Sequence, residues 1–196
     1  MAAREDEIVI RPAVVGDVPA IVALINSAAE YGLMLPRSVA QAYETVREYV
    51  VAVDGDAVVG CCALSVVGAG AAEITGLAVD ASQRGAGLGR RLVEACVDDA
   101  RRLGVGRVMA LTFERGFFER LGFAAMDSGK LPEKLWAQSV RCAKVGAEHG
   151  RQEVAMLRVL DGVAGSGEAT AEMTAALEYR VPFVMKRVGK RGDGNV

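Results

Sequence analysis

Residues 77–90 read LAVDASQRGAGLGR, and this stretch decides the class of fold. A run of apolar residues opens the stretch and predicts a strand, while apolar residues at helical spacing after Gly87 predict an amphipathic helix. The turn between them contains Gly85, Gly87 and Gly89. Glycine has no Cβ, so an anion can approach the backbone closely at such a turn. Backbone N–H groups and the positive end of the helix dipole converge there, so the stretch predicts an anion-binding site.

Three other interpretations compete with an anion site. A dinucleotide-binding turn needs G-x-G-x-x-G after the first strand of a parallel βαβ unit, whereas residues 77–90 follow an antiparallel pattern deep in the chain. A nucleotide-binding P-loop needs G-x-x-x-x-G-K-[ST], which the sequence lacks. A plain tight turn, with glycines for packing alone, stays open from the spacing. Arg84 and Arg90 favour the anion site because guanidinium groups form charge-assisted hydrogen bonds with phosphate.

Strands and helices alternate on both sides of this stretch. Residues 49–67 predict a hairpin, because Asp54-Gly55-Asp56 supplies the positive φ of a tight turn. Further strands are expected at residues 7–11, 71–79, 107–111, 123–127 and 153–160. Helices are expected after Asp17 as N-cap to about Gly32, and at residues 38–47, 87–102, 116–121 and 131–140. The chain is therefore expected to have an α/β (α+β) fold.

The composition limits the classes of protein to which the chain can belong. A length of 196 residues suits one domain with a sizeable core, and 52% hydrophobic with 24% charged residues is typical of a globular protein. The net charge of −2 argues against a nucleic-acid partner. The charged N-terminus has no secretory signal, and no apolar run is long enough to cross a membrane. We therefore expect a cytoplasmic protein with no membrane partner, and a homodimer stays open.

The cysteines do not indicate a metal site. Cys61, Cys62, Cys96 and Cys142 show no C-x-x-C spacing, and His149 is the one histidine in the sequence. We expect no bound metal. The cysteines are expected to be small buried apolar residues, or surface thiols in a reducing compartment.

The end of the chain changes in composition after residue 160. Residues 161–170 are rich in glycine, alanine and serine, which is typical of a linker. Residues 178–188 could form a last strand, but Pro182 restricts it to a sheet edge. The basic residues near the end predict a solvated tail. We therefore expect a domain over residues 5–160 and a C-terminal extension over residues 161–196.

The glycine-rich turn resembles a known motif. Arg84-x-x-Gly87-x-Gly89 matches the Q/R-x-x-G-x-G/A motif of the GNAT acetyltransferases, and it lies between a Leu-Ala-Val strand end and a helix, as in that family. The resemblance covers about residues 7–160. It implies the GNAT acyl-CoA N-acyltransferase fold, a central mixed, mostly antiparallel sheet flanked by helices. It also implies acetyl-CoA as cosubstrate, with the pyrophosphate in the turn. The implied cofactor-binding residues are Leu77, Ala78, Val79, Arg84, Gly85, Ala86, Gly87, Gly89, Arg90 and Phe118.

Glu73 is the candidate general base for acetyl transfer to an amine. The amine must lose a proton to become nucleophilic, and burial among apolar residues raises the pKa of a carboxyl group toward a useful value. Glu73 lies between apolar residues on the strand that leads into the turn, and strand alternation places it on the same face as Leu77. The alternative is a strand-edge glutamate paired with an arginine.

A closer resemblance concerns the acetyl acceptor. The chain is similar to the short bacterial N-acetylglutamate synthases, which acetylate the α-amino group of glutamate as the first step of arginine biosynthesis. The matching segments are 32–38 (GLMLPRS), 72–74 (AEI), 111–114 (LTFE), 117–123 (FFERLGF), 131–136 (LPEKLW) and 141–144 (RCAK). The resemblance implies that Leu35, Arg37 and Ser38 meet the acceptor and that Arg141 binds its second carboxylate. Guanidinium groups are natural bidentate partners for two carboxylates, although each arginine alone is more often a surface residue.

The sequence also departs from these relatives. Many GNAT enzymes have a tyrosine that protonates the CoA thiolate, where this chain has Phe117 and Phe118. The proton donor to the thiolate is then Thr112 or water, or the enzyme has no dedicated acid. Close relatives often have a second cysteine after the segment at 141–144, which this chain lacks, and longer synthases carry an arginine-sensing kinase-like domain. The alternatives are therefore a GNAT enzyme for another amine (glutamine, aspartate or a peptide N-terminus) and a non-catalytic CoA-binding module.

Overall fold

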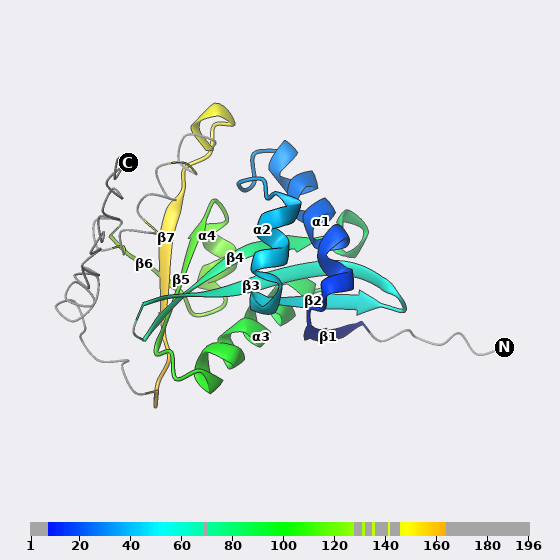
Figure 1. Cartoon of the computed structure of the whole chain (residues 1–196). Helices are drawn as coiled ribbons and strands as arrows, with labels where there is room; N and C mark the ends of the chain where they lie inside the picture. The colour runs from blue at the N-terminus through cyan, green and yellow to red at the C-terminus, as the bar shows by residue number, and fades with distance from the viewer. Residues whose placement is uncertain are drawn as a thin grey trace, which may run out of the picture.

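The computed structural model describes residues 8–68, 70–127, 131, 135, 141 and 146–163. Within these residues one seven-stranded sheet has the order β1-β2-β3-β4-β5-β7-β6 (Figure 1). The strands are β1 (Val9–Pro12), β2 (Tyr49–Asp54), β3 (Ala57–Gly68), β4 (Ala71–Val79), β5 (Arg107–Thr112), β6 (Ala124–Ala125) and β7 (Val154–Val159). The β4–β5 pair is parallel and the other pairs are antiparallel, as expected for a mixed, mostly antiparallel sheet.

Helices cover both faces of the sheet. They are α1 (Val18–Glu30), α2 (Val39–Glu44), α3 (Leu88–Arg102) and α4 (Arg115–Glu119). Figure 1 shows α1 and α2 above the strands β2 and β3 and α3 below them. The apolar face of α3, with Leu92, Val93 and Val97, is fully buried against one side of the sheet. On the other side Ile21 and Ile25 of α1 pack on the sheet. None of the helices in the described ranges is long and apolar enough to cross a membrane.

Most of the predicted elements are confirmed, but some boundaries move. The hairpin and α3 lie where the pattern placed them. The strand predicted over residues 123–127 is wrong in length, because Phe123 N–H donates to the carbonyl of Phe118 and so caps α4, which leaves Ala124–Ala125 as β6. The helix predicted to end near Arg47 ends at Glu44 and is followed by a 3-10 turn, Val46–Glu48. The predicted helix over 131–140, apart from residues 131 and 135, and the elements predicted after residue 163 lie outside the described residues.

The cysteine prediction is confirmed for the three described residues. Cys61, Cys62 and Cys96 are free and buried. Burial raises the pKa of the Cys61 thiol to about 12. Cys62 and Cys96 pack in the core between the sheet and α3, as small apolar residues do. Cys142 lies outside the described residues.

A bulge in β4 changes which side chains share a face. Ala63 pairs with Thr75 and Cys61 pairs with Ala78, so one β3 residue faces two residues of β4. Gly76 supplies the bulge with φ of 59°, a region that favours glycine. Ile74 and Leu77 therefore both pack on the α3 side of the sheet, whereas Glu73 points to the α1 side. The expectation that Glu73 and Leu77 share one face is wrong, because strict alternation stops at the bulge.

Asp17 stabilises the start of α1 in an unexpected way. It occupies the N-cap position, but its side chain makes no capping bond to the helix. Instead it accepts hydrogen bonds from the two terminal guanidinium nitrogens of Arg11, at 2.6 and 2.9 Å, and from Val14 N–H at 2.8 Å. These bonds, with Arg11 first, lower the pKa of the Asp17 carboxyl group below 3.8.

This lowered pKa predicts acid-sensitive stability. The stabilisation is present above the unfolded-state pKa and is lost as pH falls through the lower folded-state pKa. Asp17→Asn should lower the free energy of unfolding by about 1–2 kcal/mol at about pH 7, and the difference from wild type should shrink toward about pH 3. Urea unfolding at both pH values tests this. Asp98→Asn, in an exposed ion pair with Arg101, is the control and should change little. An equal Asp17 effect at both pH values would contradict the expectation.

Candidate functional site

The sheet opens into a cavity where β4 and β5 diverge. These strands pair from Ala71 opposite Arg107 to Ile74 opposite Ala110, and no further. The residues of β4 that follow, 75–79, line a cavity of about 1200 Å³. Its walls come from the α1–α2 connection, the glycine-rich turn, the start of α4 and the residues before β7. The divergence leaves backbone groups of β4 without a β5 partner, so an extended ligand can hydrogen-bond to them.

The glycine-rich turn forms one end of the cavity. Gly85 and Gly87 have φ of 86° and 78°, and Gly87 is the N-cap of α3. A Cβ at either glycine would meet no other atom within 4 Å, so the turn is open on its outer side. The first N–H groups of the 15-residue helix α3 have no acceptor within the helix and point toward this opening. Together with the guanidinium groups of Arg84 and Arg90, which line the cavity, they form a site suited to phosphate.

Local hydrogen bonds hold the turn in shape. The Ser82 hydroxyl and backbone N–H both donate to the Asp80 carboxylate, at 2.6 and 2.9 Å. These bonds lower the pKa of that carboxyl group. Asp80 N–H in turn donates to the carbonyl of Val59, which ties the turn to β3. The turn is therefore built before any ligand arrives.

Phenylalanine rings form the wall beside the turn. A Cβ at Gly89 would lie 3.5 Å from the Phe117 ring, an ordinary contact distance, so the first turn of α3 lies beside α4. Phe117 and Phe118 pack edge to face with ring centres 5.2 Å apart, and both line the cavity. This wall can contact an apolar part of a ligand, but it supplies no proton.

Two acid–base candidates lie on the strands at the opening. Glu73 is only 3% exposed and lines the cavity, with Met109 of β5 opposite it in register. It is therefore not a glutamate at the sheet edge. Thr112, at the end of β5, also lines the cavity. Its hydroxyl oxygen accepts a hydrogen bond from Glu114 N–H at 2.9 Å, which leaves the hydroxyl hydrogen as a donor.

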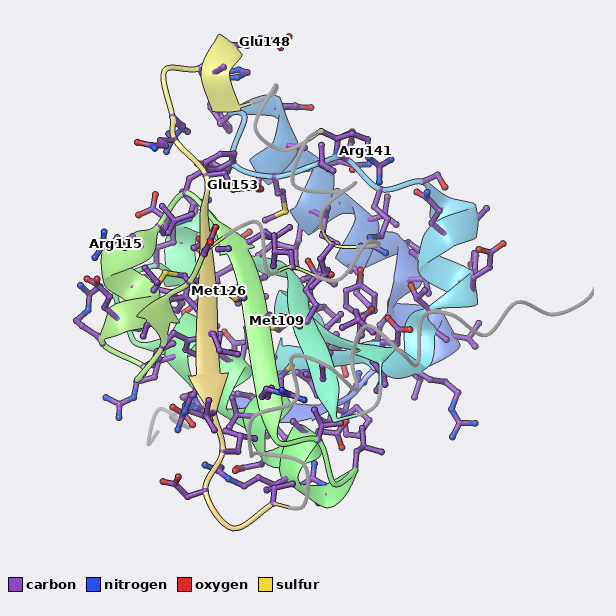
Figure 2. The ribbon with its side chains drawn as sticks, turned by 90° about the vertical axis from the view of Figure 1, so that its left-hand side faces the viewer. Met109, Arg115, Met126, Arg141, Glu148 and Glu153 are labelled. Carbon is purple, nitrogen blue, oxygen red and sulfur yellow. The ribbon has the colours of Figure 1, made fainter. Side chains whose placement is uncertain are left out.

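The opposite end of the cavity contains two arginines. The backbone of Arg37 is clamped by Asn26, whose amide oxygen accepts from Arg37 N–H at 2.8 Å and whose amide nitrogen donates to Arg37 carbonyl at 3.1 Å. Leu35 and Arg37 line the cavity from the α1–α2 connection, and Arg141 and Glu153 also line it. Figure 2 shows Arg141 near the segment that joins α1 to α2, with Glu153 at the start of β7.

The segment before β7 packs across this end of the cavity. A Cβ at Gly32 would overlap the imidazole ring of His149, and a Cβ at Gly146 would overlap the Phe113 ring. Both glycines are buried. His149 thus contacts the end of α1 while Gly146 contacts the segment after β5. Because Gly32 and Gly146 have no side chains, the segment before β7 can approach both the end of α1 and the segment after β5.

The structure brings together all but two of the predicted site residues. Ser38 does not line the cavity, because its side chain accepts from Gln41 N–H and its own N–H donates to Gln41, a capping box at the start of α2. Ala86 also lies outside the lining. The residues that sequence reasoning missed include Ile25, Gly76 and Arg120. A glycine inside an apolar strand, as at Gly76, is a signal for a bulge, whereas the other two carry no local signal. In the described part of the chain, no three His, Cys, Asp or Glu side chains gather as a metal site would require.

Comparisons with known proteins agree with this geometry. Residues 23–123 match the model of the acetyltransferase (GNAT) family. An uncharacterized N-acetyltransferase of Chlorobaculum tepidum is 36% identical over 77% of this chain and 96% of its own length. An amino-acid acetyltransferase of Mycobacterium tuberculosis is 35% identical over 73% of this chain and 83% of its own length.

A solved structure extends the comparison. The N-acetylglutamate synthase of Neisseria gonorrhoeae, complexed with coenzyme A and N-acetyl-glutamate, is 31% identical with a TM-score of 0.67. The match covers 81% of this chain and 36% of that one. The divergent strands, the glycine-rich turn and the family match lead to one conclusion: this chain belongs to the GNAT family of N-acetyltransferases, which use acetyl-CoA.

Proposed function

We propose that the chain transfers the acetyl group of acetyl-CoA to the α-amino group of L-glutamate, the reaction that opens arginine biosynthesis. One observation carries this proposal: a single cavity is lined by the glycine-rich turn, by Glu73, and by Arg37 and Arg141 together. An anion site and a pair of arginines fit two ligands, one with phosphates and one with two carboxylates. The names of the Mycobacterium and Neisseria relatives support an amino acid as acceptor.

The cosubstrate is proposed to lie along β4 with its diphosphate in the turn. Backbone N–H groups from Gly85 to Gly89, including that of Ala86, and the guanidinium groups of Arg84 and Arg90 would bind the phosphates. The backbone of Leu77, Ala78 and Val79 would hydrogen-bond the pantetheine arm, because β5 has diverged there. Phe117 and Phe118 would contact its apolar part. The acetyltransferase unit is proposed to span residues 5–160, since Leu160 N–H still bonds to Gly106 in the sheet region, and residues 161–196 would be an extension.

The acceptor is proposed to lie between the two arginines. Arg37 and the backbone of Leu35 would bind the α-carboxylate, and Arg141 would bind the side-chain carboxylate. Bidentate guanidinium pairs fix the direction of a carboxylate as well as its charge. Two such pairs orient the amino group, and orientation alone can contribute several kcal/mol to lowering the barrier.

The chemistry needs one proton removed and one supplied. Glu73 would take the proton of the ammonium group, so that the nitrogen lone pair can attack the thioester carbonyl carbon. The C–N bond forms and the C–S bond breaks, the nitrogen gives up the second of the two protons that it loses in becoming an amide, and the thiolate gains one proton. The Thr112 hydroxyl is proposed to relay this second proton, donating its own to the thiolate and regaining one from the nitrogen, with water as the other candidate relay.

A substitution in the glycine-rich turn is expected to change the KM for acetyl-CoA. Gly87→Val should raise the KM for acetyl-CoA about tenfold, because a β-branched residue is strained at φ of 78° and the turn must shift. Gly55→Val is the matched control, since Gly55 also has positive φ, of 58°, and lies in the β2–β3 turn. It should lower stability without changing this KM. Initial rates at varied acetyl-CoA test both, and an unchanged KM in Gly87→Val would contradict the proposed phosphate site.

An acceptor screen tests the proposed function. The purified chain is incubated with acetyl-CoA and one of glutamate, glutamine, aspartate or a peptide, and the release of free thiol is followed. We expect the highest kcat/KM with glutamate. A higher value for another acceptor would replace glutamate as the substrate, and no acceptor-dependent thiol release would reject the catalytic proposal.

A further inference from the structure

Tyr49, the first residue of β2, has a buried hydroxyl group that makes no hydrogen bond within the described part of the chain. The residue is 1% exposed, and its hydroxyl oxygen has no hydrogen-bond partner among the described residues. A buried hydroxyl that is not hydrogen-bonded destabilises the folded state. Burial raises the pKa of Tyr49 to about 12, so the phenol keeps its proton at neutral pH and can act as a donor.

This hydroxyl lies directly under the floor of the cavity. A Cβ at Gly76 would be 3.1 Å from the Tyr49 hydroxyl oxygen and 3.2 Å from the Ile25 Cδ1 atom. Gly76 and Ile25 both line the cavity. Because residue 76 has no side chain, the bulge of β4 leaves the hydroxyl close to the cavity surface.

The same ring supports Arg37. The guanidinium carbon of Arg37 lies 5.8 Å from the centre of the Tyr49 ring, within the range of a cation–π interaction. Asn26 holds the Arg37 backbone from the other side. An anion bound by Arg37 would therefore lie close to Tyr49 as well.

We propose that Tyr49 is a positioning residue for the acetyl acceptor, whose hydroxyl donates to the same carboxylate that Arg37 binds. This inference rests on the proposed function, because it takes a carboxylate-bearing acceptor as given. The Arg37 guanidinium group would donate two charge-assisted hydrogen bonds to the carboxylate, and the Tyr49 hydroxyl would donate a third. The bound carboxylate then accepts a hydrogen bond from a hydroxyl that has no partner among the described residues. Removal of the hydroxyl is therefore expected to weaken acceptor binding and to stabilise the ligand-free protein.

Tyr49→Phe tests the proposal because it removes the hydroxyl and keeps the ring. The KM for glutamate should rise about fivefold to tenfold, as expected for one lost hydrogen bond to a charged group. The kcat and the KM for acetyl-CoA should stay within about twofold. The Tm of the ligand-free protein should rise by about 2 °C, because the unpaired donor is gone. A purely structural role for the hydroxyl predicts a lower Tm and an unchanged KM.

Two further variants separate the contribution of the Tyr49 hydroxyl from that of its aromatic ring. Tyr43→Phe, on α2, is the matched control, because Tyr43 is 45% exposed and does not line the cavity. It should change none of these values. Tyr49→Leu also removes the ring under Arg37 and should raise the KM for glutamate further than Tyr49→Phe.

The kinetics of wild type and Tyr49→Phe distinguish a failure of the Tyr49 proposal from a failure of the proposed function. If wild type acetylates glutamate and Tyr49→Phe has an unchanged KM, the Tyr49 proposal is overturned while the function stands. If the screen identifies another carboxylate-bearing acceptor, the same comparison is made with that acceptor and is decided by the same criterion. A preferred acceptor without a carboxylate would overturn both.

Discussion

Glu73→Gln is expected to lower kcat for glutamate acetylation by about 10²–10⁴-fold, the usual range for loss of a general base. Glutamine has nearly the same shape but cannot accept the ammonium proton. Glu73 is 3% exposed in the interior of the sheet and lines the cavity at the point where β4 and β5 diverge. The KM for acetyl-CoA should change little, because the phosphate site lies at the other end of β4.

Steady-state rates over a range of pH distinguish a base from a structural residue. In wild type, kcat/KM should rise with pH as the base loses its proton and then level off, whereas in Glu73→Gln the ammonium group must lose its proton to solvent, so kcat/KM should keep rising at alkaline pH. Glu44→Gln, at the end of the exposed helix α2, is the control and should retain wild-type rates. A Glu73→Gln enzyme within about tenfold of wild type, with an unchanged pH profile, would assign the proton transfer to another group.

Arg141→Ala and Arg37→Ala are each expected to raise the KM for the acceptor about 10–100-fold, because each removes charge-assisted hydrogen bonds to a carboxylate. The two variants should differ in specificity. If Arg141 binds the side-chain carboxylate, Arg141→Ala should remove most of the preference for glutamate over glutamine. Arg37→Ala should weaken both acceptors alike, since both have an α-carboxylate.

The measurement is kcat/KM for glutamate and glutamine in each variant. Arg115→Ala is the control, because Arg115 pairs with Glu119 on α4 and lies well away from Arg141 in Figure 2. It should leave both values unchanged. If the ratio of kcat/KM for glutamate to kcat/KM for glutamine is unaltered in Arg141→Ala, this arginine does not bind the side-chain carboxylate of the acceptor.

The parts of this fold that the sequence predicted well are those with local causes. Gly55 after Asp54 supplies the positive φ of a hairpin turn, and the spacing of apolar residues after Gly87 is that of one helical face. The glycine-rich turn could be predicted because a strand, a turn and a helix follow one another directly along the chain. The structure confirms all three elements within a residue or two.

Two expectations fall at the ends of helices, where hydrogen bonds between residues three to five positions apart occupy the backbone. Phe123 was predicted in a strand, but its N–H bonds back to Phe118 and its ring packs edge to face on that residue. Ser38 is predicted to contact the acceptor, which stays a prediction, and in the structure it caps α2 through Gln41. In both places a helix end competed with the predicted role and satisfied backbone groups that would otherwise lack partners.

The sequence by itself determined the order of strands and helices, the phosphate-suited turn and the resemblance to acetyltransferases, because each depends on neighbours along the chain. The tertiary structure alone decided that β4 and β5 diverge after Ile74 and that Gly76 forms a bulge, which leaves Glu73 and Leu77 on opposite faces of the sheet. It also brought Arg37, Arg141 and the hydroxyl of Tyr49 near one cavity. These relations depend on pairing register and on packing between residues far apart in sequence, and no local pattern encodes them.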